Sequence, residues 1–344
     1  MDLFREFSEE MELRDTIPVI GAGGWGTALA TVLVDNGYKV ILWAREPELV
    51  EEINSQHTNS LFLPNAILSE NITAENDLSK FADFPFFVSA VPTQFIRSTY
   101  SNCGFSLKHK KVLNLAKGIE IGSLDLCSKI FGDLGLPSEN FAVLTGPSHA
   151  EEVSKSTPTA VVTASEDENY AFFVQKLLSN ENFRVYTSHD TVGCEMGGSL
   201  KNVIAVAAGI IDGLQIGDNT KAALLTRGLA EITRLSLALG ANAMTLSGLA
   251  GLGDLFVTCN SMHSRNRKVG ELLGQGKKLS EILTMMKTVA EGISTTKSSY
   301  ELSKKHNVEM PIIEKVHEIL FEDLDPKIAI KQLMTRESKH EWWW

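Results

Sequence analysis

The feature that most constrains the fold is a glycine-rich turn near the start of the chain. Residues 21–26 read Gly-Ala-Gly-Gly-Trp-Gly, follow the apolar segment Ile17–Ile20, and open a segment of helical length. In a strand–turn–helix unit, Gly21 permits the tight turn, Gly23 lets the backbone approach a pyrophosphate, and Gly26 lets helix and strand pack closely. The first N–H groups of the helix carry a partial positive charge that favours phosphate. The pattern predicts a dinucleotide-binding turn, and a glycine turn without a ligand is the alternative.

A second apolar strand, predicted over Lys39–Trp43, ends where such a unit sets its cofactor preference. An acidic side chain there binds the ribose 2′-hydroxyl of NAD, whereas an arginine accepts the 2′-phosphate of NADP. Arg45 stands at this place, 19 positions after Gly26. It favours NADP, or the use of both cofactors, over strict NAD. The alternative is a surface arginine whose charge is balanced by Glu46.

The length of 344 residues suits about two domains, and the first half alternates strand-like with helix-like segments. This alternation predicts an α/β domain with a mostly parallel sheet covered on both faces. The predicted strands are Ile17–Ile20, Lys39–Trp43, Phe86–Ala90, Val112–Leu115, Ala142–Leu144, Ala160–Thr163 and Arg184–Tyr186. The predicted helices between them are Gly26–Asn36, Pro47–Gln56, Gln94–Cys103, Leu124–Phe131 and Asn169–Leu178.

The second half has no strand signals after about Ser188 and is predicted to be all-helical. A long helix is predicted over Thr220–Leu239, because leucine and isoleucine recur at helical spacing and Gly240 follows. The other predicted helices are Arg267–Leu273, Leu279–Met286, Ser294–His306, Pro311–Leu320 and Pro326–Leu333. The chain ends in Trp342, Trp343 and Trp344, for which the sequence offers no physical explanation.

The charge and composition exclude several function classes. The chain carries 43 acidic and 32 basic side chains, a net charge of −11, which disfavours binding to nucleic acid or to an anionic membrane surface. The longest apolar run, Val203–Ile211, is far shorter than the roughly 20 residues of a membrane-spanning helix. The acidic N-terminal segment lacks a signal-peptide core. The four cysteines are widely spaced and suit reduced thiols, so we expect a cytoplasmic protein without a metal site.

Candidate catalytic and binding residues follow predicted strands in the first half. Lys117 follows the strand Val112–Leu115, and Gly146 and Ser148 follow Ala142–Leu144. Ligands bind at the carboxyl ends of the strands in an open parallel sheet. These residues are therefore candidates for ligand contacts, although Lys117 could equally be an ordinary surface lysine.

The helical half contributes three further candidates. Lys201-Asn202 stands at the head of an otherwise apolar helix, where a lysine either extends to the surface or has a depressed pKa and a task. Asp254 follows a run of glycines, which indicates either a carboxylate aimed at a site or a helix N-cap. Ser264, Arg265 and Asn266 begin a helix and suit an anion site, with a solvated basic patch as the alternative.

Taken together, these segments resemble the bacterial NAD(P)-dependent glycerol-3-phosphate dehydrogenases. The resemblance runs from about Thr16 to about Leu333 and implies a Rossmann-type domain over 16–188 and a helical substrate-binding and catalytic domain over 189–336, with the active site between them. An extension over 1–15 and a tail over 337–344 fall outside these domains. The segments that carry the resemblance are 21–30, 115–120, 145–153, 200–213, 218–231, 248–259, 264–270, 289–296 and 308–312.

The resemblance also implies roles for individual residues. Lys201 would be the catalytic general acid/base, and Lys117 would lie near both cofactor and substrate. The other implied substrate contacts are Gly146, Ser148, Asn202, Asp254, Ser264, Arg265 and Asn266. The implied cofactor contacts are Gly21, Gly23, Gly24, Trp25, Gly26, Arg45, Lys117, Ala150, Arg265, Val289 and Glu291.

The implied reaction is the reversible reduction of dihydroxyacetone phosphate to sn-glycerol 3-phosphate with NADH or NADPH, which supplies the glycerol backbone of phospholipids. The resemblance further implies a homodimer. A runner-up is a related two-domain dehydrogenase that acts on a hydroxy acid and offers the Arg265 cluster to a carboxylate. A non-catalytic redox sensor that binds the dinucleotide is disfavoured, because a sensor would need only the glycine turn.

Overall fold

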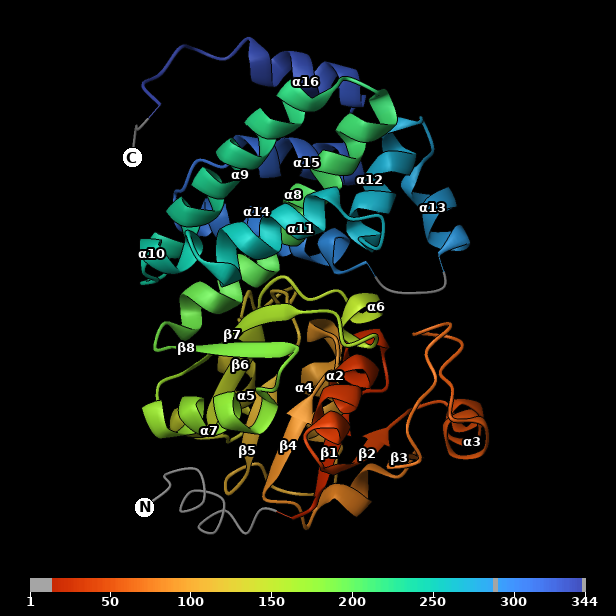
Figure 1. Cartoon of the computed structure of the whole chain (residues 1–344). Helices are drawn as coiled ribbons and strands as arrows, with labels where there is room; N and C mark the ends of the chain where they lie inside the picture. The colour runs from red at the N-terminus through yellow and green to blue at the C-terminus, as the bar shows by residue number, and fades with distance from the viewer. Residues whose placement is uncertain (1–13, 287–289, 342–344) are drawn as a thin grey trace. The chain divides into compact units, whose positions relative to one another are not determined.

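The computed structural model describes residues 14–286 and 290–341 and divides into two compact units (Figure 1). The described parts of unit 1 are residues 14–117 and 125–195, and those of unit 2 are residues 118–124, 196–286 and 290–341. The boundary predicted after residue 188 differs from this division, because the first turn of a long helix that starts at Thr191 belongs to unit 1. The segment Gly118–Leu124, predicted as part of the first domain, belongs to unit 2.

Unit 1 is built on one sheet with the strand order β3-β2-β1-β4-β5-β6-β7-β8. Neighbouring strands are parallel except for β6 and β7, which are antiparallel. The order from β3 to β6 is that of a dinucleotide-binding Rossmann sheet, whose strand order reverses beside β1. The strands are β1 (Thr16–Ile20), β2 (Lys39–Trp43), β3 (Ile72–Glu75), β4 (Phe86–Ser89), β5 (Lys111–Asn114), β6 (Phe141–Thr145), β7 (Thr159–Ser165) and β8 (Phe183–Ser188).

The seven predicted strands are confirmed to within two residues at each end, and the edge strand β3 was missed. Its sequence, Ile-Thr-Ala-Glu, alternates buried Ile72 and Ala74 with more exposed residues, but four residues are too few for a clear period of two. β3 forms because it pairs with β2, and this pairing cannot be predicted from the local sequence of β3.

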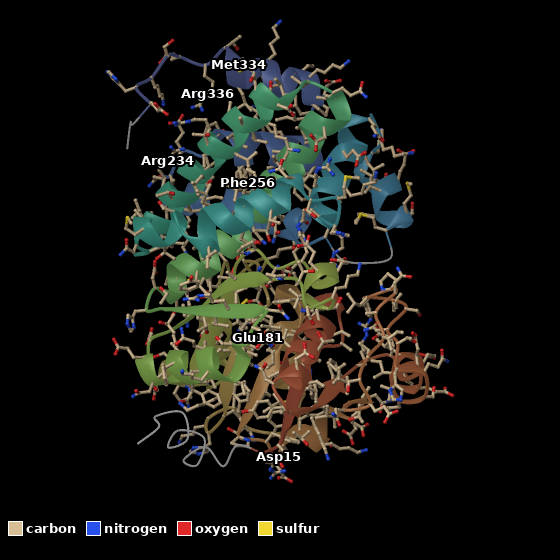
Figure 2. The ribbon with its side chains drawn as sticks, viewed as in Figure 1. Asp15, Glu181, Arg234, Phe256, Met334 and Arg336 are labelled. Atoms are coloured by element: carbon tan, nitrogen blue, oxygen red, sulfur yellow. The ribbon has the colours of Figure 1, made fainter. Side chains whose placement is uncertain are left out.

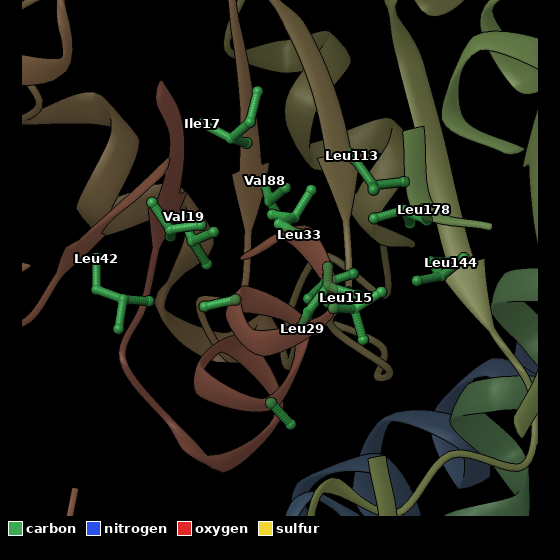
Figure 3. Close-up of a cluster of buried hydrophobic side chains, with 14 of the residues drawn as sticks. Ile17, Val19, Leu29, Leu33, Leu42, Val88, Leu113, Leu115, Leu144 and Leu178 are labelled. Atoms are coloured by element: carbon green, nitrogen blue, oxygen red, sulfur yellow. The ribbon is translucent and has the colours of Figure 1, made fainter. Parts of the chain in front are cut away.

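Helices cover both faces of the sheet, as the alternation of side chains along β4 shows. Phe86 contacts Phe173 edge-on, with ring centroids 5.6 Å apart, and the next residue, Phe87, stacks on Tyr100 at 5.6 Å. Successive strand residues point to opposite faces, so the helices that carry Phe173 and Tyr100 lie on opposite faces. Figure 3 shows the core on the face of Val88, where strand residues meet Leu29 and Leu33.

The described helices of unit 1 are α2 (Gly24–Asp35), α3 (Pro47–Gln56), α4 (Thr93–Ser101), α5 (Cys127–Asp133), α6 (Ala150–Val153) and α7 (Glu168–Leu178), with short 3₁₀ turns at Leu78–Phe81 and Ser138–Asn140. The predicted α/β class is confirmed. The predicted helix over 124–131 starts three residues later, because Leu124 has a positive φ of 64° and cannot be helical.

Unit 2 is helical, as predicted. α8 (Thr191–Leu214) has the length and apolarity of a membrane span, but its most apolar stretch is wholly buried, so it is the core helix of this unit. The other helices are α9 (Asp218–Ala238), α10 (Ala243–Leu246), the π-helix η3 (Leu249–Gly253), α11 (Asp254–Asn260), α12 (Arg265–Gly274), α13 (Leu279–Met285), α14 (Glu291–Lys305), α15 (Pro311–Phe321) and α16 (Pro326–Met334).

Candidate active site

The glycine turn of unit 1 has the geometry that its sequence predicts. Gly21 has a φ of +118°, and a Cβ there would lie 2.8 Å from the backbone of Ala90 at the end of β4. A Cβ on Gly26 would lie 2.1 Å from the carbonyl oxygen of Gly21. A Cβ on Gly23 would meet nothing within 4 Å. Gly21 and Gly26 are therefore required by the fold itself, whereas the protein leaves the space at Gly23 open for a ligand.

The start of α2 fits the pyrophosphate of a dinucleotide. Gly23 is the N-cap residue, no described side chain caps this helix end, and the first turn carries no acidic residue. The indole Nε1 of Trp25 is buried and has no hydrogen-bond partner among the described residues. These free donors and the helix dipole suit an anion. Ala150 lies beside this end, since a Cβ on Gly24 would be 3.8 Å from its side chain.

Arg45 lies just after β2, and its side chain is 77% exposed. Its Nη2 and Nε donate to Glu46 Oε1, at 2.7 and 3.1 Å. The exposed position leaves the guanidinium able to meet a 2′-phosphate. The pairing with Glu46 is the alternative that the sequence left open, and it lowers the net positive charge at this corner.

Three predicted substrate residues of unit 1 come together at the ends of β5 and β6. The carbonyl oxygen of Gly146 accepts from Lys117 Nζ at 3.3 Å and from Ser148 Oγ at 3.0 Å. Gly146 has a φ of +132°, and a Cβ there would lie 3.0 Å from Val161 Cα. The strained turn at Gly146 therefore holds an ammonium and a hydroxyl beside one carbonyl, at the carboxyl edge of the sheet.

The sequence predicted that Lys201 stands at the head of a helix. In the structure Lys201 lies near the middle of α8, in unit 2. The prediction was wrong because the residues before it, 191–199, include several glycine and polar residues that read as a loop yet are helical and mostly buried. The side chain of Lys201 is only 7% exposed. It therefore does not extend to the surface, and it has a buried charge to balance.

Lys201 is paired with Asp254, whose side chain is 1% exposed, through Nζ and Oδ1. Thr258 Oγ1 also donates to Asp254 Oδ1, at 3.3 Å. One helical turn earlier, Gly197 meets the π-helix η3: a Cβ there would lie 2.5 Å from Ala250 O. The close approach at Gly197 sets the register of α8 against η3 and α11. Asp254 is thus a partner for the lysine and not the N-cap of its helix.

A glycine seam joins α8 to α12. A Cβ on Gly209 would lie 1.9 Å from Arg267 O, and a Cβ on Gly270 would lie 1.9 Å from Val206 O. Gly213 and Gly274, four residues further along each helix, repeat the contact, with their added Cβ atoms 2.2 and 2.5 Å from backbone oxygens. The seam fixes the position of α12, which carries the predicted anion-binding residues, relative to Lys201.

An amide chain links three segments beside this seam. Asn266 Nδ2 donates to Asn202 Oδ1 at 2.8 Å, and the N–H of Gly292 donates to Asn266 Oδ1 at 2.9 Å. Glu291, a predicted cofactor contact, is the first residue of α14 and is adjacent to this chain. Val289, the other predicted contact in this segment, lies outside the described residues.

The residues predicted to form an anion site lie at the start of α12. Ser264 is the N-cap residue, and its Oγ accepts from the N–H of Arg267 at 3.2 Å. Arg265, the first helical residue, is exposed, and Asn266 is buried. The hydroxyl of Ser264 therefore has a structural role as well as its predicted role in binding.

Sequence reasoning missed the residues that hold this cluster in place. Asp212 Oδ2 accepts from Arg267 Nε at 2.6 Å and from Lys221 Nζ at 3.0 Å, so it clamps α9 and α12 to the end of α8. The four-residue spacing of Gly209 with Gly213, and of Gly270 with Gly274, was a readable signal for close helix packing. The described residues contain no group of three metal-ligating side chains.

In comparisons with known proteins, both halves of the chain match models of the same protein family. Residues 16–171 match the model of the N-terminus of NAD-dependent glycerol-3-phosphate dehydrogenase, and residues 190–331 match the model of its C-terminus. A glycerol-3-phosphate dehydrogenase [NAD(P)+] of Lysinibacillus sphaericus is 50% identical over 333 residues, which is 95% of this chain and 98% of that protein. The enzyme of the same name from Bacillus subtilis is 48% identical over 331 residues, 94% and 95% of the two chains.

Solved structures agree with the sequence relatives. The crystal structure of glycerol-3-phosphate dehydrogenase from Coxiella burnetii superposes with a TM-score of 0.89 at 39% identity and covers 93% of this chain and 99% of its own. A D-mandelate dehydrogenase structure with NADH and anilino(oxo)acetate gives a TM-score of 0.62 at 14% identity, covering 92% of this chain and 99% of its own. The second likeness is one of fold alone.

Proposed function

The chain belongs to the NAD-dependent glycerol-3-phosphate dehydrogenase family, and on that premise we propose that it reversibly reduces dihydroxyacetone phosphate to sn-glycerol 3-phosphate with Lys201 as the proton donor. The observation that carries the proposal is the buried pair formed by Lys201, near the middle of α8, and Asp254, at the start of α11. Desolvating two charges is costly, so a pair of this kind suits a chemical role better than a structural one.

Lys201 stabilises the charge that develops in the reaction. When bound, NADH or NADPH would supply the hydride for the ketone carbon, and negative charge would then develop on the former carbonyl oxygen. The ammonium of Lys201 stabilises that oxygen and gives it a proton, a contribution of about 10²–10⁴-fold in rate. Asp254 and Thr258 hold the ammonium in one orientation through Asp254 Oδ1. In the oxidative direction Lys201 takes the proton back.

The phosphate of the substrate binds at the start of α12. The N-terminal N–H groups of this helix and the exposed guanidinium of Arg265 form an anion site, and Asn202 and Asn266 bind substrate hydroxyls. Phosphate binding also orients the reacting carbon, since binding energy from a remote group can be used for positioning. Lys117, Gly146 and Ser148 of unit 1 are proposed as further substrate contacts.

The dinucleotide is held by the glycine turn of unit 1, for which the open backbone at Gly23 and the buried indole N–H of Trp25 provide support. Arg45 contacts the adenosine end, and Ala150, Val289, Glu291 and Arg265 are proposed as further contacts. The presence of Arg45 supports use of NADP as well as NAD.

Membership of this family also supports proposals about the localisation, the oligomeric state and the metabolic role of the protein. We infer a cytoplasmic homodimer that supplies glycerol 3-phosphate to phospholipid synthesis. All four cysteines are buried and none of them is in a disulfide, which is consistent with a reducing compartment. Gel filtration with light scattering tests the dimer, and a mass of one chain would contradict it.

The direct test follows the absorbance of reduced nicotinamide. Purified protein is mixed with dihydroxyacetone phosphate and either NADH or NADPH, and oxidation of the cofactor is expected with at least one of them. Unphosphorylated dihydroxyacetone and a 2-oxo acid serve as controls, and both are expected to react far more slowly. Equal rates with a 2-oxo acid would favour the hydroxy-acid dehydrogenase alternative.

A further inference from the structure

Three charged side chains of unit 2 lie at helix ends where the helix dipole disfavours their charge. Asp212 is in the last turn of α8, Lys221 is in the first turn of α9, and Arg267 is the third residue of α12. A negative charge is unfavourable near a helix C-terminus, and a positive charge is unfavourable near an N-terminus. The three side chains stabilise one another instead, because the Asp212 carboxylate accepts from Lys221 Nζ at 3.0 Å and from Arg267 Nε at 2.6 Å. The cluster is therefore explained by the contact that it makes between helices, not by local preference.

Arg267 connects Asp212 to a residue of the proposed phosphate site. The side chain of Arg267 binds Asp212, while its backbone N–H donates to Ser264 Oγ at 3.2 Å. Ser264 Oγ uses a lone pair for this bond, so its O–H can still be donated to a phosphate oxygen. Asp212, Arg267 and Ser264 thus form one connected path from the end of α8 to a hydroxyl that we propose contacts the substrate.

The first turn of α12 is unusually basic. It carries Arg265, Arg267 and Lys268 and no acidic residue. Cations at the positive end of a helix are unfavourable unless an anion lies nearby. Asp212 provides that anion for Arg267, whose side chain is only 13% exposed, and leaves the exposed Arg265 to a ligand. Two cations, Lys221 and Arg267, and one carboxylate give the cluster a net charge of +1, which still favours an anion at this helix end.

The charged cluster also lies near the proposed proton donor, on the evidence of a buried thiol in α11. Figure 2 labels Phe256 of this helix, which is 61% exposed, whereas Cys259 is fully buried. Burial raises the pKa of the Cys259 thiol to about 12, and the charges of Lys221 and Asp212 also act on it. The charges of the two members of the buried catalytic pair act on the same thiol. The Asp212 cluster and the catalytic pair are therefore both within electrostatic reach of one side chain.

We propose, on the basis of the proposed function, that Asp212 is a positioning residue for the substrate phosphate. It holds Arg267 and, through Arg267, keeps the Ser264 hydroxyl and the first N–H groups of α12 where the phosphate binds. Asp212 touches neither substrate nor cofactor itself. Its effect on phosphate binding is geometric, because charge alone acts in the opposite direction: removing the carboxylate raises the charge of the cluster from +1 to +2 and would attract a phosphate more strongly.

The test variant is Asp212→Asn, which removes the charge at nearly constant shape, and circular dichroism checks that it is folded. Arg267→Lys is a second variant, which keeps every charge of the cluster but changes the position of the donor. The matched control is Glu271→Gln, which removes one acidic charge from α12, where Glu271 pairs at 3.0 Å with Lys268 of the same helix. Calorimetric titration with inorganic phosphate measures the anion site, and initial rates give kcat/KM for dihydroxyacetone phosphate and for unphosphorylated dihydroxyacetone.

Asp212→Asn and Arg267→Lys should each weaken phosphate binding and lower kcat/KM for dihydroxyacetone phosphate by about tenfold, within the ~10²-fold that a misplacement of about 1 Å can cost. The kcat/KM for dihydroxyacetone, which lacks the phosphate, should stay unchanged, and Glu271→Gln should change neither substrate.

An equal loss for the two substrates would show a merely structural role and overturn the proposal. Tighter phosphate binding by Asp212→Asn, the result that charge alone predicts, would overturn it as well. If the unmodified protein bound phosphate but did not reduce dihydroxyacetone phosphate, the proposed function would be contradicted, and the phosphate titrations of the variants would still decide the role of Asp212.

Discussion

The two units build their parts of the proposed site in different ways. Unit 1 prepares a surface for the cofactor from backbone, with Gly21, Gly23 and the first N–H groups of α2 contributed by one short stretch of chain. Unit 2 prepares its cluster from side chains, with Lys201 and Asp254 separated by 53 positions. The difference has a physical reason, because a pyrophosphate can be bound by backbone dipoles whereas a proton must be given by an ionisable side chain.

The two designs place different demands on the scaffold. A backbone site needs only that a local turn has the right shape. A side-chain site needs several helices held at fixed distances, and unit 2 achieves this with the glycine seam of α8 and α12 and with the Asp212 clamp. We therefore expect the chemistry of unit 2 to fail when helix packing is disturbed, and that of unit 1 only when the turn itself is changed.

The largest expected effect is that of Lys201→Ala, which should lower kcat by at least about 10²–10⁴-fold while binding of NADH stays intact. Initial rates and a fluorescence titration with NADH measure the two properties. The variant leaves Asp254 buried without its partner, at a cost of about 3–5 kcal/mol, so folding must be checked. Lys201→Met combined with Asp254→Asn removes both charges at similar volume and should fold yet remain inactive. Near-normal turnover in either variant would rule out the proton role.

The second effect tests one buried carboxylate in each unit. Burial raises the pKa of Glu195 in unit 1 and of Glu231 in unit 2 to about 7. Glu195 accepts from the N–H and hydroxyl of Ser128, and Glu231 accepts from the N–H groups of Ile312 and Ile313 at the start of α15. In the unfolded chain the pKa of a glutamate is near 4.5. Between pH 4.5 and about 7, each of these carboxyls is therefore protonated in the folded protein and ionised in the unfolded chain. Each group therefore makes its full contribution to the free energy of unfolding below pH 4.5. That contribution, about 3 kcal/mol for each group, is lost as the pH rises to about 7.

Urea unfolding between pH 4.5 and 7.5 measures this loss. Glu195→Gln and Glu231→Gln should each flatten the pH profile, since an amide does not titrate. Glu52→Gln is the control of opposite sign when the series is extended below pH 4.5, because the N–H of Ser60 holds the pKa of Glu52 below its usual value and its small contribution is lost as pH falls through that range. An unchanged slope in both buried-glutamate variants would contradict the assignment.

The backbone site of unit 1 could be predicted from the sequence more fully than the side-chain site of unit 2, because the first is built from one short stretch of chain and the second is not. The turn at Gly21–Gly26 is local, so its residues and its conformation could be predicted together. The partners of Lys201 could not, because the contact of Gly197 with Ala250 arises only when α8 packs on η3. The family resemblance supplied the names of the residues but not the helix in which Lys201 lies, which was predicted to begin ten residues too late.

The third effect compares one glycine from each unit. Gly270→Ala places a methyl group 1.9 Å from Val206 O, so we expect a loss of about 1–3 kcal/mol in stability and a lower kcat/KM for dihydroxyacetone phosphate, with NADH binding retained. Gly23→Ala meets nothing in the protein and should leave stability unchanged while weakening NADH binding.

Thermal unfolding and NADH titration separate these two outcomes. Gly132→Ala, at an open position in α5, is the control and should raise stability by about 0.5–1 kcal/mol without any effect on binding. If Gly23→Ala unfolded the protein, or if it bound NADH normally, the glycine turn would not be the open backbone site described above.

The smallest expected effect concerns Arg45, which tests whether unit 1 relies on backbone alone. A backbone site recognises the pyrophosphate shared by both cofactors, so any preference between them must come from a side chain. Arg45 is exposed and already paired with Glu46, so its contact with a 2′-phosphate should contribute only about 1 kcal/mol, or about fivefold in affinity. Arg45→Asp should raise KM for NADPH by about that factor more than KM for NADH. Glu46→Gln, which frees the guanidinium, should shift the ratio the other way. Equal changes in both Michaelis constants would show that Arg45 does not contact the 2′-phosphate and that the preference lies elsewhere in the unit.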